Sequence, residues 1–282
     1  MQRYSHRKII NIFIYIKRNG LAIRFLVALQ DNFTQNVENK IVSLTLQVGT
    51  TTWLAHFLNI SDLTLEQKAV VNTSRLLHKV VPPLFKVPRH LLPISQLAKS
   101  TVSFSMVRHP FERLVSAYQD KIVDNTDPSY THIASKLKRE YGEVSFHSFA
   151  LYVLDTAKHM CLPPPARCHL DVHWRPFYAR CAFCTTHYKV IAKAETFSTD
   201  LEQIGRLAGI HFPTLVTHHS SGDTSELAAT YFRQVPVDVV DELAHLYKPD
   251  LAMFGYSVDT YIALAQKVNV SNNANLNSDP RM

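Results

Sequence analysis

The sequence predicts an α/β fold with a central parallel sheet and flanking helices. Three short segments, 41–46, 101–107 and 187–193, are rich in β-branched and apolar residues and are typical of strands. Segments with apolar residues at helical spacing lie between and after them. Strands separated by helices favour a parallel sheet with helices on its faces.

The first predicted strand leads into a loop and a helix. Residues 41–46 are followed by Gln47-Val48-Gly49-Thr50-Thr51-Thr52, and 53–58 continue with helical character. Thr51 or Thr52 is the expected N-cap, because a hydroxyl there can accept from the N–H groups of the first turn. A second helix is expected over 62–79.

The second predicted strand, 101–107, ends at Arg108-His109-Pro110. Apolar residues then recur at helical spacing and predict an amphipathic helix over 111–123. Further helices are expected at 145–156, 199–207, 225–232 and 237–247.

We expect three parts along the chain: an N-terminal arm or degraded signal-anchor (1–40), one domain (41–260) and a disordered tail (261–282). A spanning helix needs about 20 nearly uninterrupted apolar residues. The arm is basic at its start and is interrupted by Lys17, Arg18 and Arg24, so it fails that criterion. The tail is rich in Asn and Ser, which is typical of a disordered terminus.

Composition excludes several classes of protein. With 46% hydrophobic and 19% charged residues among 282, the chain is globular and not mostly disordered. It has 7 glycines, and neither G-x-G-x-x-G nor the Walker A pattern occurs. The formal charge of +7 favours anionic partners such as nucleotides or sulfated sugars. No nucleic-acid-binding signature accompanies that charge, so no nucleic-acid partner is expected.

The four cysteines, Cys161, Cys168, Cys181 and Cys184, lie close together. An even, clustered set favours two disulfides in an oxidising compartment. A zinc site is the alternative, since the last two have ligand spacing, although three prolines between the first two fit it poorly. We expect no metal. Sequons for N-glycosylation, which support a luminal setting weakly, begin at Asn32, Asn59, Asn72 and Asn269.

Two strand ends carry candidate binding chemistry, because ligands of open parallel sheets bind beyond the carboxyl ends of the strands. Residues 47–52 offer backbone N–H groups, hydroxyls and a helix N-terminus, which together suit an anion, although simple helix capping is the alternative. Arg108 can make bidentate bonds to phosphate, and Ser116 lies on the polar side of the next helix. The alternative for Arg108 is a surface ion pair with Glu112.

The segment Arg108-His109-Pro110-Phe111-Glu112-Arg113-Leu114-Val115-Ser116-Ala117-Tyr118-Gln119-Asp120-Lys121 resembles the 3′-phosphate-binding segment of the Golgi carbohydrate sulfotransferases. That group contains the chondroitin and dermatan 4-sulfotransferases and the HNK-1 sulfotransferase. Stretches of 47–53, 173–196 and 247–256 resemble the same family in the same order. The resemblance covers about residues 42 to 257.

The resemblance implies a P-loop-like sulfotransferase fold for 41–260 and a donor, 3′-phosphoadenosine 5′-phosphosulfate (PAPS). It also implies a sugar hydroxyl of a glycan or proteoglycan as acceptor, and a type II protein of the Golgi membrane with a luminal catalytic domain. By the family pattern, Arg108 and Ser116 hold the 3′-phosphate. The residues implied for the 5′-phosphosulfate are Gln47, Val48, Gly49, Thr50, Thr51, Thr52 and Trp53.

The chain departs from the family pattern at Gln47, where the family has a lysine. Glutamine can donate one hydrogen bond to the leaving oxygen but brings no charge, and loss of one such donor commonly costs about 3–4 kcal/mol. We therefore expect a sulfotransferase of reduced activity, with a non-catalytic nucleotide- or glycan-binding relative as the alternative. His173, and less so His109, is the candidate base for the acceptor proton.

Overall fold

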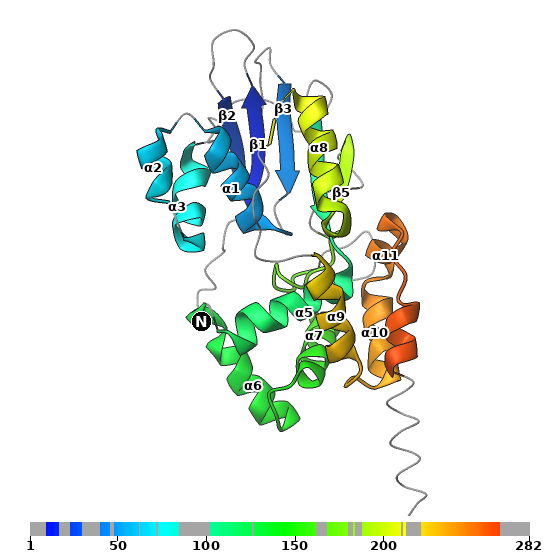
Figure 1. Cartoon of the computed structure of the whole chain (residues 1–282). Coiled ribbons are helices and arrows are strands. Elements are labelled where there is room, and N and C mark those ends of the chain that lie inside the picture. The colour runs from blue at the N-terminus through cyan, green and yellow to red at the C-terminus, as the bar shows by residue number, and fades with distance from the viewer. Residues whose placement is uncertain are drawn as a thin grey trace, which may run out of the picture. The chain divides into compact units, whose positions relative to one another are not determined.

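The computed structural model describes residues 10–16, 23–29, 40–45, 48–61, 63–71, 73–84, 102–125, 127–161, 168–179, 183, 188–209, 211–212 and 221–265 (Figure 1). The chain divides into two compact units, and each is assembled from two stretches of sequence. The first unit comprises Met1–Val107 and Ala182–His218, and the second comprises Arg108–Cys181 and His219–Met282.

The first unit contains the sheet, whose strand order is β2-β1-β3-β4-β5. β3, β4 and β5 are parallel, which confirms the predicted parallel sheet, whereas β1 runs antiparallel to both β2 and β3. The two antiparallel strands come from the segment that the sequence assigned to an N-terminal arm. The strands are β1 Ile10–Ile16, β2 Ile23–Leu29, β3 Lys40–Thr45, β4 Val102–Val107 and β5 Val190–Lys193.

Helices of the first unit follow the strands, as the α/β pattern requires. The connection from β3 to β4 contains α1 (Thr50–Ile60), α2 (Leu65–Ala69) and α3 (Ser74–Leu84). A short 3₁₀ turn, η3 (Ala194–Thr196), leads from β5 into α8 (Phe197–Ala208).

The prediction of one helix over 62–79 was wrong, because this stretch forms two helices. α2 begins with a capping box in which Thr64 and Gln67 bond each other's backbone N–H groups. α3 follows Thr73, whose hydroxyl accepts from the Leu76 N–H at 3.3 Å. Threonine hydroxyls compete with the helical backbone in this way, so each favours a helix start over a helix interior.

The core of the first unit lies between α1 and the sheet. Trp53 is fully buried and its ring lies 4.9 Å from that of Phe104 on β4 and 5.8 Å from that of Phe57. Its indole N–H donates to Met106 Sδ at 2.9 Å. The residues that follow β3 are therefore anchored to the neighbouring strand.

The second unit is helical. α5 (Pro110–Tyr118) continues into a π-helical turn, η1 (Gln119–Val123), which together confirm the predicted helix over 111–123. The other predicted helices of this unit are confirmed as α7 (Phe146–Met160), α9 (Ser221–Phe232) and α10 (Val237–Leu246), and the helix predicted at 199–207 is α8 of the first unit. The sequence did not predict η2 (Pro128–Tyr130), α6 (Thr131–Tyr141) or α11 (Lys248–Phe254).

α5 lies beside α7 and α9 (Figure 1), and eight of its nine residues are buried. Phe111 stacks on Phe232 of α9 with 4.6 Å between ring centroids. Tyr118 packs against Phe149 of α7 at 5.5 Å. The motif that resembles the sulfotransferase segment is thus mostly core, which limits the residues that can bind a ligand.

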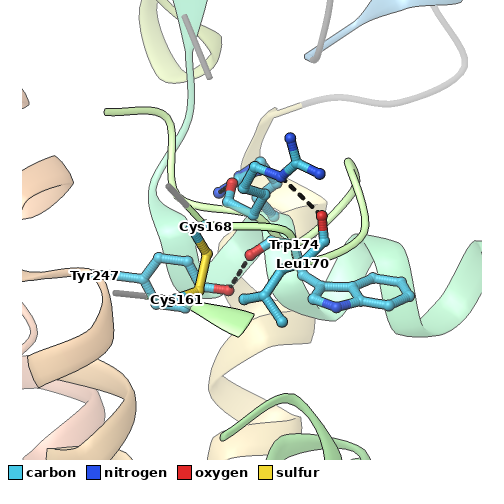
Figure 2. Close-up of a disulfide and its surroundings, with 7 residues drawn as sticks. Cys161, Cys168, Leu170, Trp174 and Tyr247 are labelled. Carbon is cyan, nitrogen blue, oxygen red and sulfur yellow. Dashed lines mark hydrogen bonds between the residues drawn. A yellow bond between two sulfur atoms is a disulfide. The ribbon is translucent and has the colours of Figure 1, made fainter. Parts of the chain in front are cut away.

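Cys161 and Cys168 form a disulfide (Figure 2), which agrees with the expectation that the four cysteines pair with one another and chooses between connectivities that the sequence left open. Cys181 and Cys184 lie outside the described residues, so their predicted pairing stays a prediction. Within the described ranges, no helix combines the length and the apolar character needed to cross a membrane.

Candidate functional site

The turn from β3 into α1 depends on Gly49, which is the N-cap of the helix. Gly49 has a φ of 60° in the left-handed region, where glycine avoids the clash of a Cβ. The first helical hydrogen bond runs from the Trp53 N–H to the Gly49 carbonyl at 2.9 Å. The prediction of Thr51 or Thr52 as N-cap was therefore wrong, because the chain turns before them. Gln47 lies outside the described residues.

The first turn of α1 presents the N–H groups of residues 50–52 at the positive end of the helix. No acidic side chain lies in that turn, and no side chain caps it. Thr51 is exposed, with its hydroxyl 3.3 Å from His78 Nε2, while Thr52 is half-buried. This arrangement suits an anion.

Val48 and Trp53, also expected to contact the donor, are both buried. Because both N–H groups of Trp53 bond within the protein, this residue supports the turn through packing. Its side chain offers no donor to a ligand.

Arg108 directly follows β4, and its Nε donates to Glu112 Oε2 at 3.3 Å. The side chains are 14% and 8% exposed, so the pair lies largely below the surface. Among the described residues Glu112 is the hydrogen-bond partner of Arg108, and it engages Nε alone. The two Nη groups, which form the fork that binds phosphate, face no competing partner there.

Ser116 is the one residue of α5 that is not buried. Glu112 and Ser116 are four residues apart on α5, so they lie on one face of the helix, and Arg108, which precedes the N-cap His109, contacts Glu112. Arg108 and Ser116, the two residues expected to hold the 3′-phosphate, both belong to the second unit.

His109 has a structural role. Its Nδ1 accepts from the Phe111 N–H at 3.2 Å, so it caps α5, and its Nε2 lies 2.9 Å from the Ser257 carbonyl. An acceptor Nδ1 requires a donor Nε2, so both ring nitrogens are committed to the backbone. The ring is also buried against Tyr256 and Tyr261 at 5.2 and 5.0 Å.

His173 has the geometry of a positioned base. Its Nδ1 lies 2.7 Å from Asp171 Oδ1, and its backbone N–H donates to the same oxygen at 2.9 Å. The Tyr130 hydroxyl donates to Asp171 Oδ2 at 3.0 Å and lies 3.1 Å from His173 Nδ1. The His173 side chain is 36% exposed.

The segment that carries His173 is held by buried charges. Arg113 donates to the Arg175 carbonyl at 2.8 Å and lies 4.2 Å from the Phe177 ring. Asp250 is fully buried and accepts from the Phe177 and Tyr178 N–H groups at 2.6 and 2.9 Å. Burial raises the pKa of Asp250, while the Arg113 charge and these two donors oppose that shift.

Two further hydrogen bonds fix the same segment. One comes from the side chain of Tyr247, and the other joins two residues of the segment itself. The Tyr247 hydroxyl donates to the Trp174 carbonyl at 2.6 Å, as Figure 2 shows. Arg175 Nε donates to the Leu170 carbonyl at 2.7 Å. Burial raises the pKa of Tyr247 far above its usual range, so its hydroxyl remains a donor at neutral pH.

The sequence reasoning missed Asp171, Tyr130 and Asp250. Asp171 precedes His173 by two residues, and a carboxylate this near a histidine in the sequence could have indicated that the two side chains interact. Asp250 belongs to the Tyr247-Lys248-Pro249-Asp250 stretch that resembles the family, although nothing there indicated its partners. Tyr130 is 43 residues from His173 and gave no signal.

Among the described residues, no three His, Cys, Asp or Glu side chains gather closely enough to hold a metal ion. Cys181 and Cys184, the pair with zinc-ligand spacing, are not among those residues.

The profile of the sulfotransferase family matches residues 31–257. The chain belongs to the sulfotransferase family. Carbohydrate sulfotransferase 11 of Rattus norvegicus is 32% identical over 188 residues, which cover 61% of this chain and 51% of that protein. Carbohydrate sulfotransferase 10 of Xenopus laevis is 32% identical, with 60% and 51% covered, and carbohydrate sulfotransferase 12 of Mus musculus is 28% identical, with 61% and 43% covered.

The sulfotransferase chain spans about half the length of the curated relatives it matches. No solved structure matches it significantly. Membership of the family confirms the resemblance on which the expected fold rested.

Proposed function

We propose that this sulfotransferase moves a sulfuryl group from PAPS to a sugar hydroxyl of a glycan or proteoglycan. The observation that carries the proposal is Arg108. It follows β4 directly, lies in the matched segment and keeps its Nη fork unbonded to the described residues. The names of the relatives support a carbohydrate acceptor.

PAPS is anionic at both ends, and the chain offers an anion-binding feature for each. The N-terminus of α1, with no acidic residue in its first turn, suits the 5′-phosphosulfate. The fork of Arg108, with the Ser116 hydroxyl, suits the 3′-phosphate. Trp53 and Gly49 shape the first feature, because one anchors the helix and the other allows its sharp start.

The proposed reaction is an in-line displacement at sulfur. The acceptor oxygen forms a new bond to sulfur while the bond from sulfur to the phosphate oxygen breaks. The electron pair of that bond leaves with 3′,5′-bisphosphoadenosine, and the acceptor proton passes to His173. Catalysis of this kind depends mainly on positioning and on stabilising the charge that develops on the leaving phosphate.

The proposed setting is the lumen of the Golgi, with type II membrane anchoring as in the family that the sequence resembles. The Cys161–Cys168 disulfide supports an oxidising compartment. The sequon at Asn59 lies at an exposed residue of α1, where a glycan could be attached.

The deciding experiment is transfer of radiolabelled sulfate from PAPS to a panel of desulfated glycans. It is combined with calorimetric titration of 3′,5′-bisphosphoadenosine. Transfer to one or more acceptors would support the proposal. Nucleotide binding without transfer to any acceptor would favour the non-catalytic relative, for which Gln47 is the specific observation. A protein that neither binds the nucleotide nor transfers sulfate would rule out both the enzyme and the non-catalytic nucleotide-binding relative.

A further inference from the structure

His173 lies in a closed hydrogen-bond network that fixes which of its ring nitrogens carries a proton. Asp171 faces three donors: the His173 backbone N–H, the His173 Nδ1–H and the Tyr130 hydroxyl, at 2.9, 2.7 and 3.0 Å. A carboxylate accepts only, so the nitrogen beside it must be the protonated one. Burial alone would raise the pKa of Asp171, but the bonds and charge from His173, with Tyr130, lower it.

The other ring nitrogen of His173 is left with its lone pair. No described residue forms a hydrogen bond with Nε2, and about a third of the side chain is exposed. An imidazole whose Nδ1–H is held by a carboxylate, with an accessible Nε2, is arranged to take a proton from a hydroxyl and to stabilise the imidazolium that forms.

We propose that Asp171 and Tyr130 are positioning residues that hold the His173 imidazole as the Nδ1–H tautomer, with Nε2 directed to the acceptor hydroxyl. This inference rests on the proposed function. It assigns Asp171 and Tyr130 to the acceptor side of the reaction, whereas Arg108 and the N-terminus of α1 serve the donor.

Other charged groups around this network are already paired. Lys121 lies 5.5 Å from the Tyr130 ring and pairs with Asp120 at 2.6 Å. Arg113 contacts the His173 carbonyl at 3.4 Å, so it acts on the backbone. Arg175 interacts electrostatically with Asp171. Asp171 is the carboxylate that contacts the imidazole.

Substitution of Asp171 by asparagine tests the proposal because the side chain keeps its size. An amide N–H in place of one oxygen would favour the opposite tautomer of His173, as in serine-protease triads, where the equivalent change lowers kcat about 10⁴-fold. We expect Asp171→Asn to lower kcat by about 10²–10⁴-fold and to leave the dissociation constant of 3′,5′-bisphosphoadenosine unchanged. Tyr130→Phe should lower kcat about 10-fold, since it removes one hydrogen bond to a charged group.

Three readouts separate positioning from a structural role. First, the acidic limb of the kcat profile should move to lower pH in Asp171→Asn, because the imidazolium loses its counter-charge. Second, Asp171→Asn should cost almost nothing more once His173→Ala is present, as groups that act as a unit are non-additive. Third, nitrogen NMR of the labelled ring should detect Nδ1–H in the wild type and a changed tautomer in Asp171→Asn.

A matched control exists in the same unit. Tyr141 donates to Asp155 Oδ2 at 2.8 Å, which reproduces the tyrosine–carboxylate bond without a histidine. Tyr141→Phe and Asp155→Asn should leave kcat and its pH profile unchanged.

An Asp171→Asn protein with an unchanged pH profile, or with a further large loss on top of His173→Ala, would overturn the proposal. So would an Nε2–H tautomer in the wild type. The NMR result needs no turnover. If the tautomer is as expected but no acceptor is sulfated, the geometry holds and the proposed function fails.

Discussion

Arg108 combines two roles at the scale of a single residue. It donates to Glu112, which is buried, and its fork is the expected contact for the 3′-phosphate. Removing the arginine therefore affects stability as well as binding, and a test must separate the two.

We predict that Arg108→Ala abolishes detectable binding of 3′,5′-bisphosphoadenosine, a loss of about 2–5 kcal/mol, since it truncates one partner of a desolvated charge pair. Titration calorimetry measures the loss. The double variant Arg108→Ala/Glu112→Gln also removes the charge of the buried carboxylate that Arg108 contacts, so any loss of stability should shrink while binding stays absent. Arg139→Ala is the matched control, because that exposed arginine also pairs with a glutamate, Glu140. An unchanged dissociation constant for Arg108→Ala would place the phosphate elsewhere.

Gln47 is the residue on which the rate of transfer is expected to depend. If it weakens stabilisation of the leaving phosphate, Gln47→Lys should raise turnover by about one to three orders of magnitude. Affinity for the product nucleotide should change much less, because the new charge acts mainly in the transition state. The measurement is kcat against the dissociation constant of the bisphosphate. A wild type already as fast as the variant would show that another cation serves the leaving oxygen.

His56 is expected to make the first unit sensitive to acid. Burial lowers its pKa from 6.5 to about 4, and among the described residues its Nδ1 has no hydrogen-bond partner. The ring lies 6.0 Å from Phe197 and 5.7 Å from Phe212, so a charge there is unfavourable. Between pH 6.5 and about 4 the unfolded chain binds this proton and the folded chain does not. Stability from this residue is therefore lost as pH falls through that window.

We predict that the Tm of the wild type falls between neutral pH and about pH 5, and that His56→Phe reduces this fall. A phenyl ring fits the aromatic surroundings and cannot bind a proton. His159→Gln, at an exposed residue of α7, is the control and should leave the dependence unchanged. Thermal melts across this range by circular dichroism measure it. The same slope in His56→Phe and wild type would contradict the assignment.

At the scale of elements, the matched segment that begins at Arg108 contributes mainly to the core. α5 buries all but one of its residues, so its motif serves the core through Phe111 and Arg113, while Arg108 and Ser116 are the residues proposed to hold the 3′-phosphate. The segment from Leu170 to Tyr178 has no helix or strand assigned. It is fixed by side chains of α5 and α11 and by Tyr247, the residue that joins α10 to α11.

Asp250 should be the residue whose loss damages that segment most. Asp250→Asn removes the counter-charge 4.0 Å from the buried Arg113 and replaces one acceptor of a backbone N–H by an amide donor. Breaking a buried pair by removing one partner typically costs about 3–5 kcal/mol. Urea unfolding should show that loss, and kcat should fall with it because His173 belongs to the same segment. Asp241→Asn, at an exposed residue of α10, is the control. An equally stable Asp250→Asn protein would contradict this role.

At the scale of the whole molecule, a disulfide is the feature of the fold that supports the proposed oxidising compartment. The Cys161–Cys168 disulfide closes a short loop with a sequence separation of 7 between the end of α7 and the segment that holds His173. A cross-link of this kind stabilises the protein by restricting the unfolded chain.

We predict that non-reducing mass spectrometry of secreted protein finds a peptide linked through Cys161 and Cys168, and a second disulfide between Cys181 and Cys184. The double variant Cys161→Ser/Cys168→Ser should lose about 2–3 kcal/mol, as expected for a loop of this length. Because the variant has no Cys161–Cys168 disulfide to break, a reductant should no longer lower its unfolding midpoint in urea by reducing this bond. Four free thiols in secreted material would contradict both the pairing and the luminal setting.

The sequence by itself determined the three parallel strands, most of the helices and the family. Alternation and helical spacing are local patterns, and the segment from Arg108 to Lys121 is long enough to be specific. It also placed Arg108 at the end of β4, because that position follows from chain order alone. The domain boundaries and the roles of Gln47 and of the residues expected to hold the donor stay predictions.

Only the tertiary structure decided which polar residues are engaged by the protein itself. It assigned His109 to a helix cap and gave His173 its partners Asp171 and Tyr130. It also placed the N-cap of α1 at Gly49 and divided the helix expected over 62–79 into two. The physical reason is that a hydrogen bond depends on the position of both partners. Tyr130 and His173 are separated by 43 residues, so no pattern within either segment indicates the other.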